Sequence, residues 1–393
     1  MNYEFPKIET LNDVLPAIEN SPEFKVLDRG YFNVVNYLVV YDDTFPPIKS
    51  AGGSAKDRAE SERLKKIRRE CRGLIFDRKT GKLLARRYHK FFNLNEREET
   101  LAENIDWTKP HIILEKLDGS MVSPVKVGDK ILWTTKLGVT EVADGAEQYV
   151  KKHPNYLEFV AMCIDGEFTP IFEWCSNKAR IVVDFPEDKL YLTAIRHNTS
   201  GRYMTWEFTS NTAKHHGIDI VPVLAANVGK SFDVSKLEGK EGIVVRFDDG
   251  HMVKVKTEWY VLRHKSKEII LREKGVLELI FNDKVDDILP FLVEADRMRL
   301  LKYRDAVLKE VGLSVNVIGN EADRYMRLYN FDRKKFALES NAESLVKSIV
   351  FRMFDGDKDV AEQVRKHIQS HLSTREKIGL VRYLWNYLDW DEF

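Results

Sequence analysis

The residues best suited to covalent chemistry lie in the segment Glu115-Lys116-Leu117-Asp118-Gly119-Ser120. It follows the apolar run 112–114, which is typical of a buried strand. A lysine amine can attack an electrophile once it has lost its proton. A Lys-x-Asp-Gly match alone is a weak signal, because about 0.1 accidental copies are expected in a chain of this length. Taken by itself, the segment fits a strand, a turn and a surface lysine equally well.

A second pair of lysines stands in Lys254-Val255-Lys256. Alternate residues of a strand point to the same face, so the two ammonium groups are expected side by side. In isolation this pattern is more typical of a solvent-facing strand edge. Further polar motifs accompany the two lysine segments along the chain. They are Glu70-Cys71-Arg72-Gly73, His89-Lys90-Phe91-Phe92-Asn93, Thr135-Lys136-Leu137-Gly138, Phe172-Glu173 and Lys240-Glu241-Gly242.

Four of these motifs, in the order Lys-x-Asp-Gly, Glu, Glu-Gly and Lys-x-Lys, resemble the covalent nucleotidyltransferase superfamily of ATP-dependent ligases and RNA capping enzymes. An ordered set of this kind rarely arises by accident. More narrowly, the chain is similar to the RNA ligase 1 family of T-even-type bacteriophages. The segments that carry this resemblance are 70–73, 89–96, 116–120, Asn177 with Arg180-Ile181-Val182, and 256–260. It extends from about residue 30 to 260 and more loosely into the C-terminal part, whereas residues 50–68 look like an insertion.

The resemblance implies an ATP-dependent RNA ligase that acts in three steps. A lysine attacks the α-phosphate of ATP to form lysyl-AMP, the AMP passes to an RNA 5′-phosphate, and a 3′-hydroxyl then displaces the AMP. Lys116 is the expected nucleophile. An ordinary lysine, with a pKa of about 10.4, is almost fully protonated at neutral pH, and nearby cations and burial favour the neutral amine. Lys254 and Lys256 are the candidates for those cations, and they would also stabilise charge developing on the α-phosphate.

The resemblance also implies roles for the remaining motifs. Glu173 corresponds to the carboxylate that bonds the ribose hydroxyl, and Glu241 to the acid that holds a divalent ion directly or through water. Mg²⁺ suits carboxylate and phosphate oxygens, with Mn²⁺ as the alternative ion. The full set of nucleotide-binding residues expected in this way is Arg72, Lys90, Glu115, Gly119, Lys136, Glu173, Glu241, Lys254 and Lys256.

Four positions in that set need further comment. Arg72 and Lys90 are expected near the pyrophosphate or the RNA phosphates, since arginine binds phosphate bidentately. Gly119 is expected to let the backbone approach the nucleotide closely. Lys136 stands where the family has a Lys-Gly pair, which Leu137 interrupts here.

Other polar segments leave two interpretations open. Asp118 either contacts the ligand or orients its loop through an Asx-type turn. One of Phe91 and Phe92 is expected in the core, while the other could stack on a base. Asp286-Asp287 fits a second cation site or, more simply, the start of a helix. Arg333-Lys334-Lys335, between Phe331 and Phe336, fits RNA contact or a solvated surface.

Three further patterns are excluded as sites. Val228-Gly229-Lys230-Ser231 looks like half of a phosphate-binding loop, but Leu224 occupies the place of its first glycine. His215-His216 and the pair Cys163 and Cys175 lack metal-ligand spacing, so we expect loop and core positions there.

The elements that must position these residues change in character along the chain. Residues 72–260 read mainly as short strands, with a hairpin around Asp248-Asp249-Gly250 and a helix over Lys151–Cys163. Residues 56–72 read as a solvated basic helix, with phosphate contact as the alternative. After about residue 265 the apolar spacing becomes helical. Two capping boxes are expected there, Ser340–Glu343 and Ser373–Glu376, with a helix end at Asp355-Gly356.

The predicted fold class is therefore α+β. A nucleotidyltransferase domain, ATP-grasp-like with antiparallel sheets flanked by helices, is expected over residues 1–265. An all-helical domain that contributes RNA preference is expected over residues 266–393.

Composition limits the remaining possibilities. The 393 residues include 62 basic and 62 acidic side chains and are 43% hydrophobic, which permits packed cores and excludes global disorder. No apolar stretch approaches the roughly 18 residues of a membrane helix, and no secretory signal is apparent at the start. Three scattered cysteines favour a reducing compartment, so we expect the cytoplasm, or the host-cell cytoplasm if a phage encodes the chain. Zero net charge argues against a long nucleic-acid tract but permits a local basic pocket.

The predicted function is ATP-dependent joining of 5′-phosphate and 3′-hydroxyl ends of single-stranded RNA. Nicked tRNA anticodon loops, a separate end-healing kinase or phosphatase, and a monomeric state are expectations by family analogy. The alternatives are an mRNA-capping guanylyltransferase, a DNA ligase or a non-catalytic RNA-binding adaptor. Helices in place of an OB-fold after the paired lysines argue against the first two. The complete set of charged motif residues argues against the third.

Overall fold

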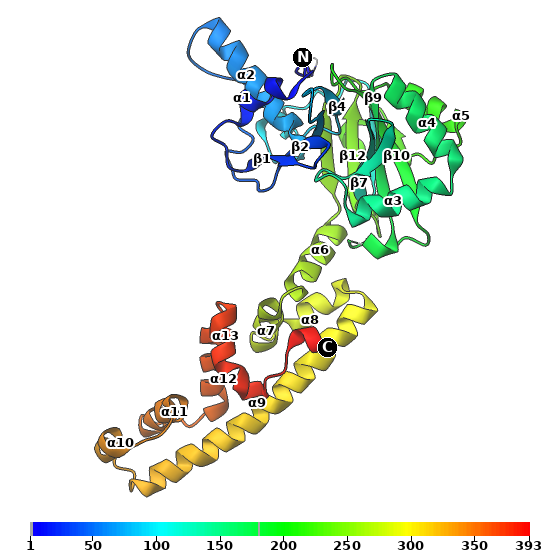
Figure 1. Ribbon diagram of the computed structural model, residues 1–393. Helices are drawn as coiled ribbons and strands as arrows, with labels where there is room; N and C mark the ends of the chain where they lie inside the picture. Colours follow the sequence, from blue (N-terminus) through cyan, green and yellow to red (C-terminus); the bar gives the residue numbers. More distant parts are fainter. Residues whose placement is uncertain (1–2, 180) are drawn as a thin grey trace. The chain divides into compact units, whose positions relative to one another are not determined.

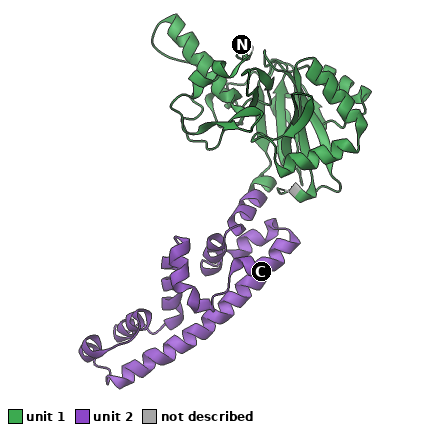
Figure 2. Cartoon of the chain, viewed as in Figure 1, with its two compact units in different colours: residues 1–261 green, residues 262–393 purple. Residues whose placement is uncertain are grey.

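The structure is a computed structural model that describes residues 3–179 and 181–393. It divides into two compact units, residues 1–261 and residues 262–393 (Figures 1 and 2). The first contains three largely antiparallel sheets with flanking helices, and the second is helical. The predicted α+β fold class is confirmed. Arg180 of the Asn177 motif lies outside the described residues.

The first sheet of unit 1 has the strand order β1-β2-β3-β4 and is antiparallel throughout. Its strands are β1 (Phe24–Asp28), β2 (Phe32–Tyr37), β3 (Arg72–Asp77) and β4 (Leu83–Ala85). The helices beside it are η1 (Leu11–Asp13), α1 (Leu15–Ile18) and α2 (Ala55–Glu70). Ile67 of α2 is fully buried against Val35, Leu74 and Phe76. The predicted basic helix is thus confirmed, but it ends at Glu70 because Arg72 already pairs in β3.

Two further sheets complete unit 1, with the orders β10-β9-β7-β8 and β11-β6-β12-β13-β5. The strands are β5 (Phe92–Asn93), β6 (His111–Lys116), β7 (Ser120–Val127), β8 (Lys130–Thr134), β9 (Phe168–Cys175), β10 (Lys189–His197), β11 (Val223–Ala226), β12 (Gly242–Phe247) and β13 (Met252–Lys256). The helices are α3 (Glu141–Lys151), α4 (Pro154–Asp165), α5 (Trp206–His215), η2 (Glu98–Thr100), η3 (Asn177–Ala179), η4 (Gly229–Ser231) and η5 (Val234–Lys236). Apolar residues of α3, α4 and α5 pack against β9 and β10 (Figure 1).

Most predicted elements of unit 1 are confirmed, including the β12–β13 hairpin around residues 248–250. The helix predicted over Lys151–Cys163 is wrong in its limits. α3 ends at Lys151 and α4 begins at Pro154, with Lys152 and His153 between them. Proline has no backbone N–H to donate, so it starts a new helix rather than continuing the first.

Unit 2 is built around the 35-residue helix α9 (Glu294–Leu328). Its buried positions, such as Leu300, Tyr303, Val307 and Val311, recur at helical spacing and form part of one core cluster. The other helices are α6 (Glu258–Ile270), which begins in unit 1, α7 (Glu273–Phe281), α8 (Val285–Ile288), η6 (Leu289–Phe291), α10 (Arg333–Glu339), α11 (Ser344–Phe354), α12 (Val360–His371), α13 (Arg375–Val381), η7 (Arg382–Trp385) and η8 (Trp390–Glu392). In the part of the chain that the structure describes, no helix combines the length and apolar character needed to cross a membrane.

The helix ends of unit 2 test the capping predictions. α11 ends before Asp355-Gly356 as predicted, with Gly356 at a φ of 93°. The box predicted at Ser340–Glu343 is wrong, because the Ser340 hydroxyl accepts from Ala342 N and α11 begins only after Glu343. In the second box the cap is shifted by one residue, since Thr374, and not Ser373, accepts from Lys377 N.

These caps generate a stability prediction. Thr374→Ala should lower the free energy of unfolding by about 1 kcal/mol, because the amide of Lys377 loses its acceptor. Ser373→Ala is the matched control and should change stability by less than about 0.5 kcal/mol. Urea titration followed by circular dichroism measures both. Equal effects of the two variants would contradict the assignment of Thr374 as the cap.

Candidate active site

One cavity of about 630 Å³ in unit 1 is lined by every residue of the predicted site. Its walls come from all three sheets and from the segments that follow β4 and β8. The predicted residues along it are Arg72, Lys90, Glu115, Lys116, Gly119, Lys136, Glu173, Glu241, Lys254 and Lys256. The fold therefore brings together motifs that are up to 184 positions apart (256 − 72) in the sequence.

Strands β6, β12 and β13 place Lys116 and Lys256 around one carboxylate. Gly242 pairs with Lys116 on one side and with Lys256 on the other. The preceding residue, Glu241, is only 5% exposed, and its Oε2 lies 2.7 Å from Lys116 Nζ. Its Oε1 lies 3.4 Å from Lys256 Nζ. A side chain at Gly242 would place its Cβ 2.1 Å from the carbonyl oxygen of Val255, so glycine is required for this close strand pairing.

Lys254 lies on the same cavity wall but in a more positive environment. Burial lowers its pKa to about 7, and the nearby cations Lys90, Arg72 and Lys116 act in the same direction. Its ammonium group lies 5.9 Å from the centre of the Phe91 ring. At neutral pH, Lys254 is therefore close to its midpoint between charged and neutral forms.

Glu173 of β9 has the opposite perturbation. Burial raises its pKa to about 7, although Lys116 opposes the shift, and Glu241 adds to it. Gly119 packs directly against this strand. A Cβ there would lie 2.6 Å from the carbonyl oxygen of Trp174 and 2.9 Å from Glu173 Cγ. The glycine is thus required by the approach of β7 to β9, a reason different from the predicted approach to a nucleotide.

The cavity also contains a cluster of cations around an aromatic residue that the sequence did not indicate. Lys90 Nζ and Lys136 Nζ lie 5.5 Å and 5.4 Å from the centre of the Tyr37 ring. Burial alone would raise the pKa of Tyr37, but Arg72, Lys90 and Lys136 outweigh it and lower that pKa below its ordinary value. Tyr37 ends β2 without any recognisable motif, so only the folded chain reveals it.

The irregular motif at Lys136 has a simple structural basis. Thr135 and Gly138 exchange backbone hydrogen bonds of 2.8 Å and 3.1 Å, which makes Lys136 and Leu137 a two-residue turn. Gly138 has a φ of 101°, a conformation that favours glycine. The residue inserted before the glycine is therefore accommodated in a turn, and Lys136 still lines the cavity.

Asp118 has a structural role in this arrangement. Its carboxylate accepts hydrogen bonds of 2.7 Å from the amides of both Val182 and Val183, and one of 2.6 Å from the Tyr260 hydroxyl. These partners are 64, 65 and 142 positions away, so the bonds are long-range and differ from the Asx-type turn considered above. Asp118 thus links the segment after Lys116 to Val182 and Val183 and to Tyr260.

Alternation along strands separates core residues from cavity residues. Phe92 is 2% exposed and belongs to the core of the first sheet, whereas Phe91 lines the cavity. In β12, Ile243 and Val245 are buried in a core cluster, while Val244 lines the cavity. The prediction that one phenylalanine is core is confirmed.

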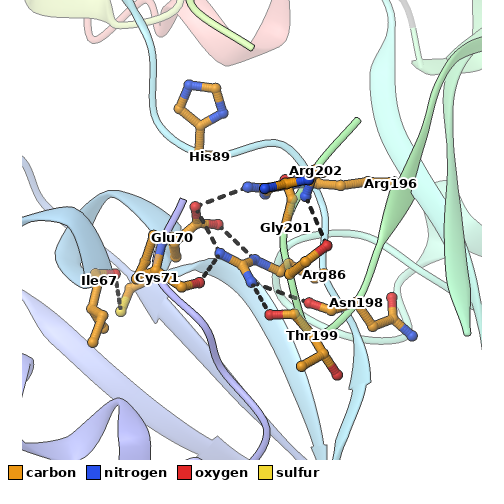
Figure 3. Close-up of polar contacts among 12 residues, drawn as sticks. Ile67, Glu70, Cys71, Arg86, His89, Arg196, Asn198, Thr199, Gly201 and Arg202 are labelled. Atoms are coloured by element: carbon orange, nitrogen blue, oxygen red, sulfur yellow. Dashed lines mark hydrogen bonds and ion pairs between the residues drawn. The ribbon is translucent and has the colours of Figure 1, made fainter. Parts of the chain in front are cut away.

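A buried ionic network surrounds Glu70, two residues before Arg72, and the sequence did not indicate it. Glu70 lies between two buried arginines, with Arg86 Nη2 at 3.0 Å and Arg196 Nη2 at 2.8 Å from its Oε1 (Figure 3). Those arginines hold the pKa of Glu70 at about 2, against the effect of burial. The network anchors the backbone just before Arg72.

Among the described residues, those of the weaker sequence signals do not line this cavity. No group of three or more His, Cys, Asp or Glu side chains in the described part of the chain could hold a metal ion. Cys163 and Cys175 are buried and free, and residues 229–231 form the short helix η4. Arg333 pairs with Asp355, and Phe336 is buried while Phe331 is exposed. Asp286 and Asp287 occupy the first turn of α8, as the simpler interpretation predicted.

Comparison with known proteins identifies the family. Residues 70–260 match a family model described as RNA ligase. This part of the chain belongs to the RNA ligase family. The match confirms both the predicted family and the predicted enzyme class, an RNA ligase.

The individual relatives match different shares of this chain. A putative RNA ligase of Thermovibrio ammonificans is 27% identical over 350 residues, 86% of each chain. RNA ligase 1 of bacteriophage TS2126 is 25% identical over 257 residues, 60% of each chain. Among solved structures, an archaeal ATP-dependent RNA ligase has a TM-score of 0.43 at 11% identity and covers 65% of this chain and 64% of its own. A Naegleria gruberi RNA ligase mutant with ATP and Mn has a TM-score of 0.34 at 17% identity over 40% and 52%.

The perturbed carboxyl of Glu173 generates a pH prediction. Its pKa is raised from 4.5 to about 7 on folding, so the stability that protonated Glu173 contributes is present below pH 4.5 and is lost as pH rises through 7. Because glutamine does not ionise, Glu173→Gln should not lose stability in this way as the pH rises. The variant should gain up to about 3 kcal/mol of unfolding free energy relative to wild type between pH 5 and pH 8.

Thermal unfolding at several pH values measures this difference. Glu167→Gln, at an exposed position, is the control and should follow the wild-type pH dependence. A constant offset between Glu173→Gln and wild type over the whole range would contradict the prediction.

Proposed function

We propose that this ligase joins 5′-phosphate and 3′-hydroxyl ends of single-stranded RNA through lysyl-AMP and RNA-adenylate intermediates, with Lys116 as the nucleophile. The observation that carries the proposal is the position of Lys116 Nζ. It faces the cavity, 2.7 Å from Glu241, on a wall shared with Lys254 and Lys256. Lys116 thus has a buried carboxylate partner and shares its wall with two other lysines.

The first step needs a neutral amine and a stabilised phosphate. The Lys116 nitrogen attacks the α-phosphorus of ATP, an N–P bond forms, and the bond to the leaving pyrophosphate breaks. Glu241 accepts a hydrogen bond from the ammonium group and keeps it oriented into the cavity before its proton is lost. Lys254 and Lys256 supply positive charge where the phosphate becomes more negative.

A divalent ion fits the oxygen donors of this wall. Glu241 is the residue we expect to hold Mg²⁺, or Mn²⁺, directly or through water, and the ion would neutralise phosphate charge. Mg²⁺ commonly takes one or two protein carboxylates and completes its shell with phosphate and water oxygens.

The rest of the cavity is suited to the nucleoside and to the other phosphates. Glu173 is proposed to accept a hydrogen bond from a ribose hydroxyl, and Phe91 and Val244 offer apolar surface to a base. Glu115 and Gly119 also line the part of the cavity proposed for the nucleoside. Arg72, Lys90 and Lys136 form the cationic cluster around Tyr37 and are proposed to hold the β- and γ-phosphates or the RNA phosphates.

The later steps use the same groups. The 5′-phosphate oxygen of RNA attacks the phosphorus of lysyl-AMP, the N–P bond breaks, and the Lys116 amine is restored as RNA-adenylate forms. The 3′-hydroxyl of the second end then attacks the RNA phosphate, and AMP leaves. Cationic residues of the cavity stabilise the phosphate charge in both steps.

Several wider features follow from the family resemblance and are part of the proposal. We assign adenylyl transfer to the N-terminal domain, residues 1–265, and RNA preference to the helical domain, residues 266–393. Nicked tRNA anticodon loops are the proposed substrate, in the cytoplasm or in a phage-infected host cell. The proposal also includes a monomer and a separate kinase or phosphatase that prepares the ends.

The direct test is covalent labelling by ATP. Wild-type protein incubated with α-labelled ATP and Mg²⁺, without RNA, should retain label after denaturing electrophoresis. Lys116→Ala should lose it by at least about 1000-fold, because the attacking amine is missing. Lys130→Ala, at an exposed strand start, is the matched control and should label like wild type.

The labelling result also separates the competing functions. Transfer of label only from GTP would indicate a capping guanylyltransferase. Label from neither nucleotide between pH 6 and 9 would favour a non-catalytic adaptor and would contradict the proposal. Label from ATP that is discharged onto nicked DNA but not onto RNA would indicate a DNA ligase.

Lys254 generates a second prediction. Its pKa of about 7 means that the amine is mostly neutral at pH 8 in the free protein. A bound polyphosphate should raise this pKa, so binding of a non-reactive α,β-methylene ATP analogue at pH 8 should take up close to about one proton per site. Calorimetry in two buffers of different ionisation enthalpy measures the uptake. Lys254→Met should abolish it, and an unchanged value in that variant would contradict the assignment.

A further inference from the structure

Arg87 is a buried cation that the proposed chemistry does not use directly. It follows β4 and precedes the cavity residue Tyr88, and it is only 1% exposed. Its guanidinium donates hydrogen bonds to the carbonyl oxygen of Gly73 and to both the Oγ1 and the carbonyl oxygen of Thr134. Within the described part of the chain, no carboxylate pairs with Arg87, and its Nε has no hydrogen-bond partner.

The acceptors of Arg87 belong to different sheets and adjoin two cavity cations. Gly73 follows Arg72 in β3 of the first sheet, and Thr134 ends β8 of the second sheet, two residues before Lys136. The two segments are also in direct contact. A Cβ at Gly73 would lie 2.7 Å from Lys136 Cα, and the φ of Gly73 is 83°. Arg87 therefore connects the backbones that carry Arg72 and Lys136.

The energetics argue against a purely structural reason for an arginine here. The acceptors of Arg87 are two carbonyl oxygens and one hydroxyl, none of which carries a charge. Burial, together with the nearby Arg72, lowers the pKa of Arg87 to about 9. An unpaired buried charge is costly, so replacing it by an apolar residue of similar volume removes that desolvation cost. The Arg87 backbone is itself held, because its carbonyl oxygen accepts from Arg196, which also pairs with Glu70 in the network of Figure 3.

We propose that Arg87 is a positioning residue that sets the spacing between Arg72 and Lys136, so that both cations engage the pyrophosphate portion of the nucleotide. The inference rests on the proposed function for the identity of the ligand, and it adds a residue outside the predicted site. Bonds from one planar group to two segments fix both distance and orientation, which a single apolar contact would not do. Arg87 acts through the two cations and has no contact with the reacting atoms.

The primary experiment measures binding of inorganic pyrophosphate by calorimetry, which needs no catalysis. Arg87→Met keeps much of the side-chain volume and should weaken pyrophosphate binding at least about tenfold. Binding of AMP should change less than about threefold, since AMP lacks the pyrophosphate portion. The free energy of unfolding should not fall in parallel. Arg87→Lys should recover part of the pyrophosphate affinity.

Kinetics provide a second measurement. The ATP concentration that gives half-maximal lysyl-AMP formation should rise about tenfold in Arg87→Met, with a smaller change in the maximal rate. If wild type forms no lysyl-AMP, the proposed function fails, whereas the pyrophosphate measurement still decides the role of Arg87.

Three results would overturn the role of Arg87. They are absence of pyrophosphate binding by wild type, unchanged pyrophosphate affinity in folded Arg87→Met, and equal losses of AMP and pyrophosphate binding. If Arg87→Met does not fold, Thr134→Val replaces it, because that variant removes one acceptor of Arg87 and keeps the cation. Unchanged pyrophosphate affinity in Thr134→Val would then overturn the proposal.

Discussion

The cavity depends on the carboxylate of Glu241, which contacts the ammonium groups of Lys116 and Lys256 from two neighbouring strands. Without it, cations from three strands and two loops would face one another in a partly dry space, and their repulsion would oppose folding. Glu241 can occupy this place only because Gly242 lets β12 lie close to β13. The carboxylate of Glu241 and the lack of a side chain at Gly242 thus allow several cations to line one cavity without a bound phosphate.

The remaining cations are supported differently. Among the described residues, Lys254 has no carboxylate ion pair. Burial and nearby cations lower its pKa to about 7, so an incoming anion would favour its charged form. Arg72 and Lys136 are held through their backbones, on which the guanidinium of Arg87 converges. Three features therefore offset the repulsion between these cations. They are the ion pair with Glu241, the lowered pKa of Lys254 and the backbones on which Arg87 converges. This arrangement favours binding of an anion over neutralisation by the protein itself.

Much of the fold and of the candidate site could be read from the sequence. Period-two alternation placed Lys254 and Lys256 on one face of a strand, and both line the cavity. Local sequence signals misplaced the starts of two helices. Pro154 divided a predicted helix, and Thr374 replaced Ser373 as a cap. Adjacent cap positions differ by about 1 kcal/mol, which a sequence pattern does not resolve.

By itself, the sequence determined the residue types that the chemistry requires, their order and the family to which residues 70–260 belong. Tertiary structure alone decided which groups meet. Four contacts join residues that are distant in the chain. Glu241 contacts two lysines, Tyr37 lies among three cations, Asp118 accepts from the amides of Val182 and Val183, and Arg87 links two sheets. Such contacts have no local signature, because they depend on how separate sheets pack, and they determine the charge and hydrogen bonding that each side chain experiences. The neutral total charge, which argued against a long nucleic-acid tract, is compatible with one strongly basic cavity.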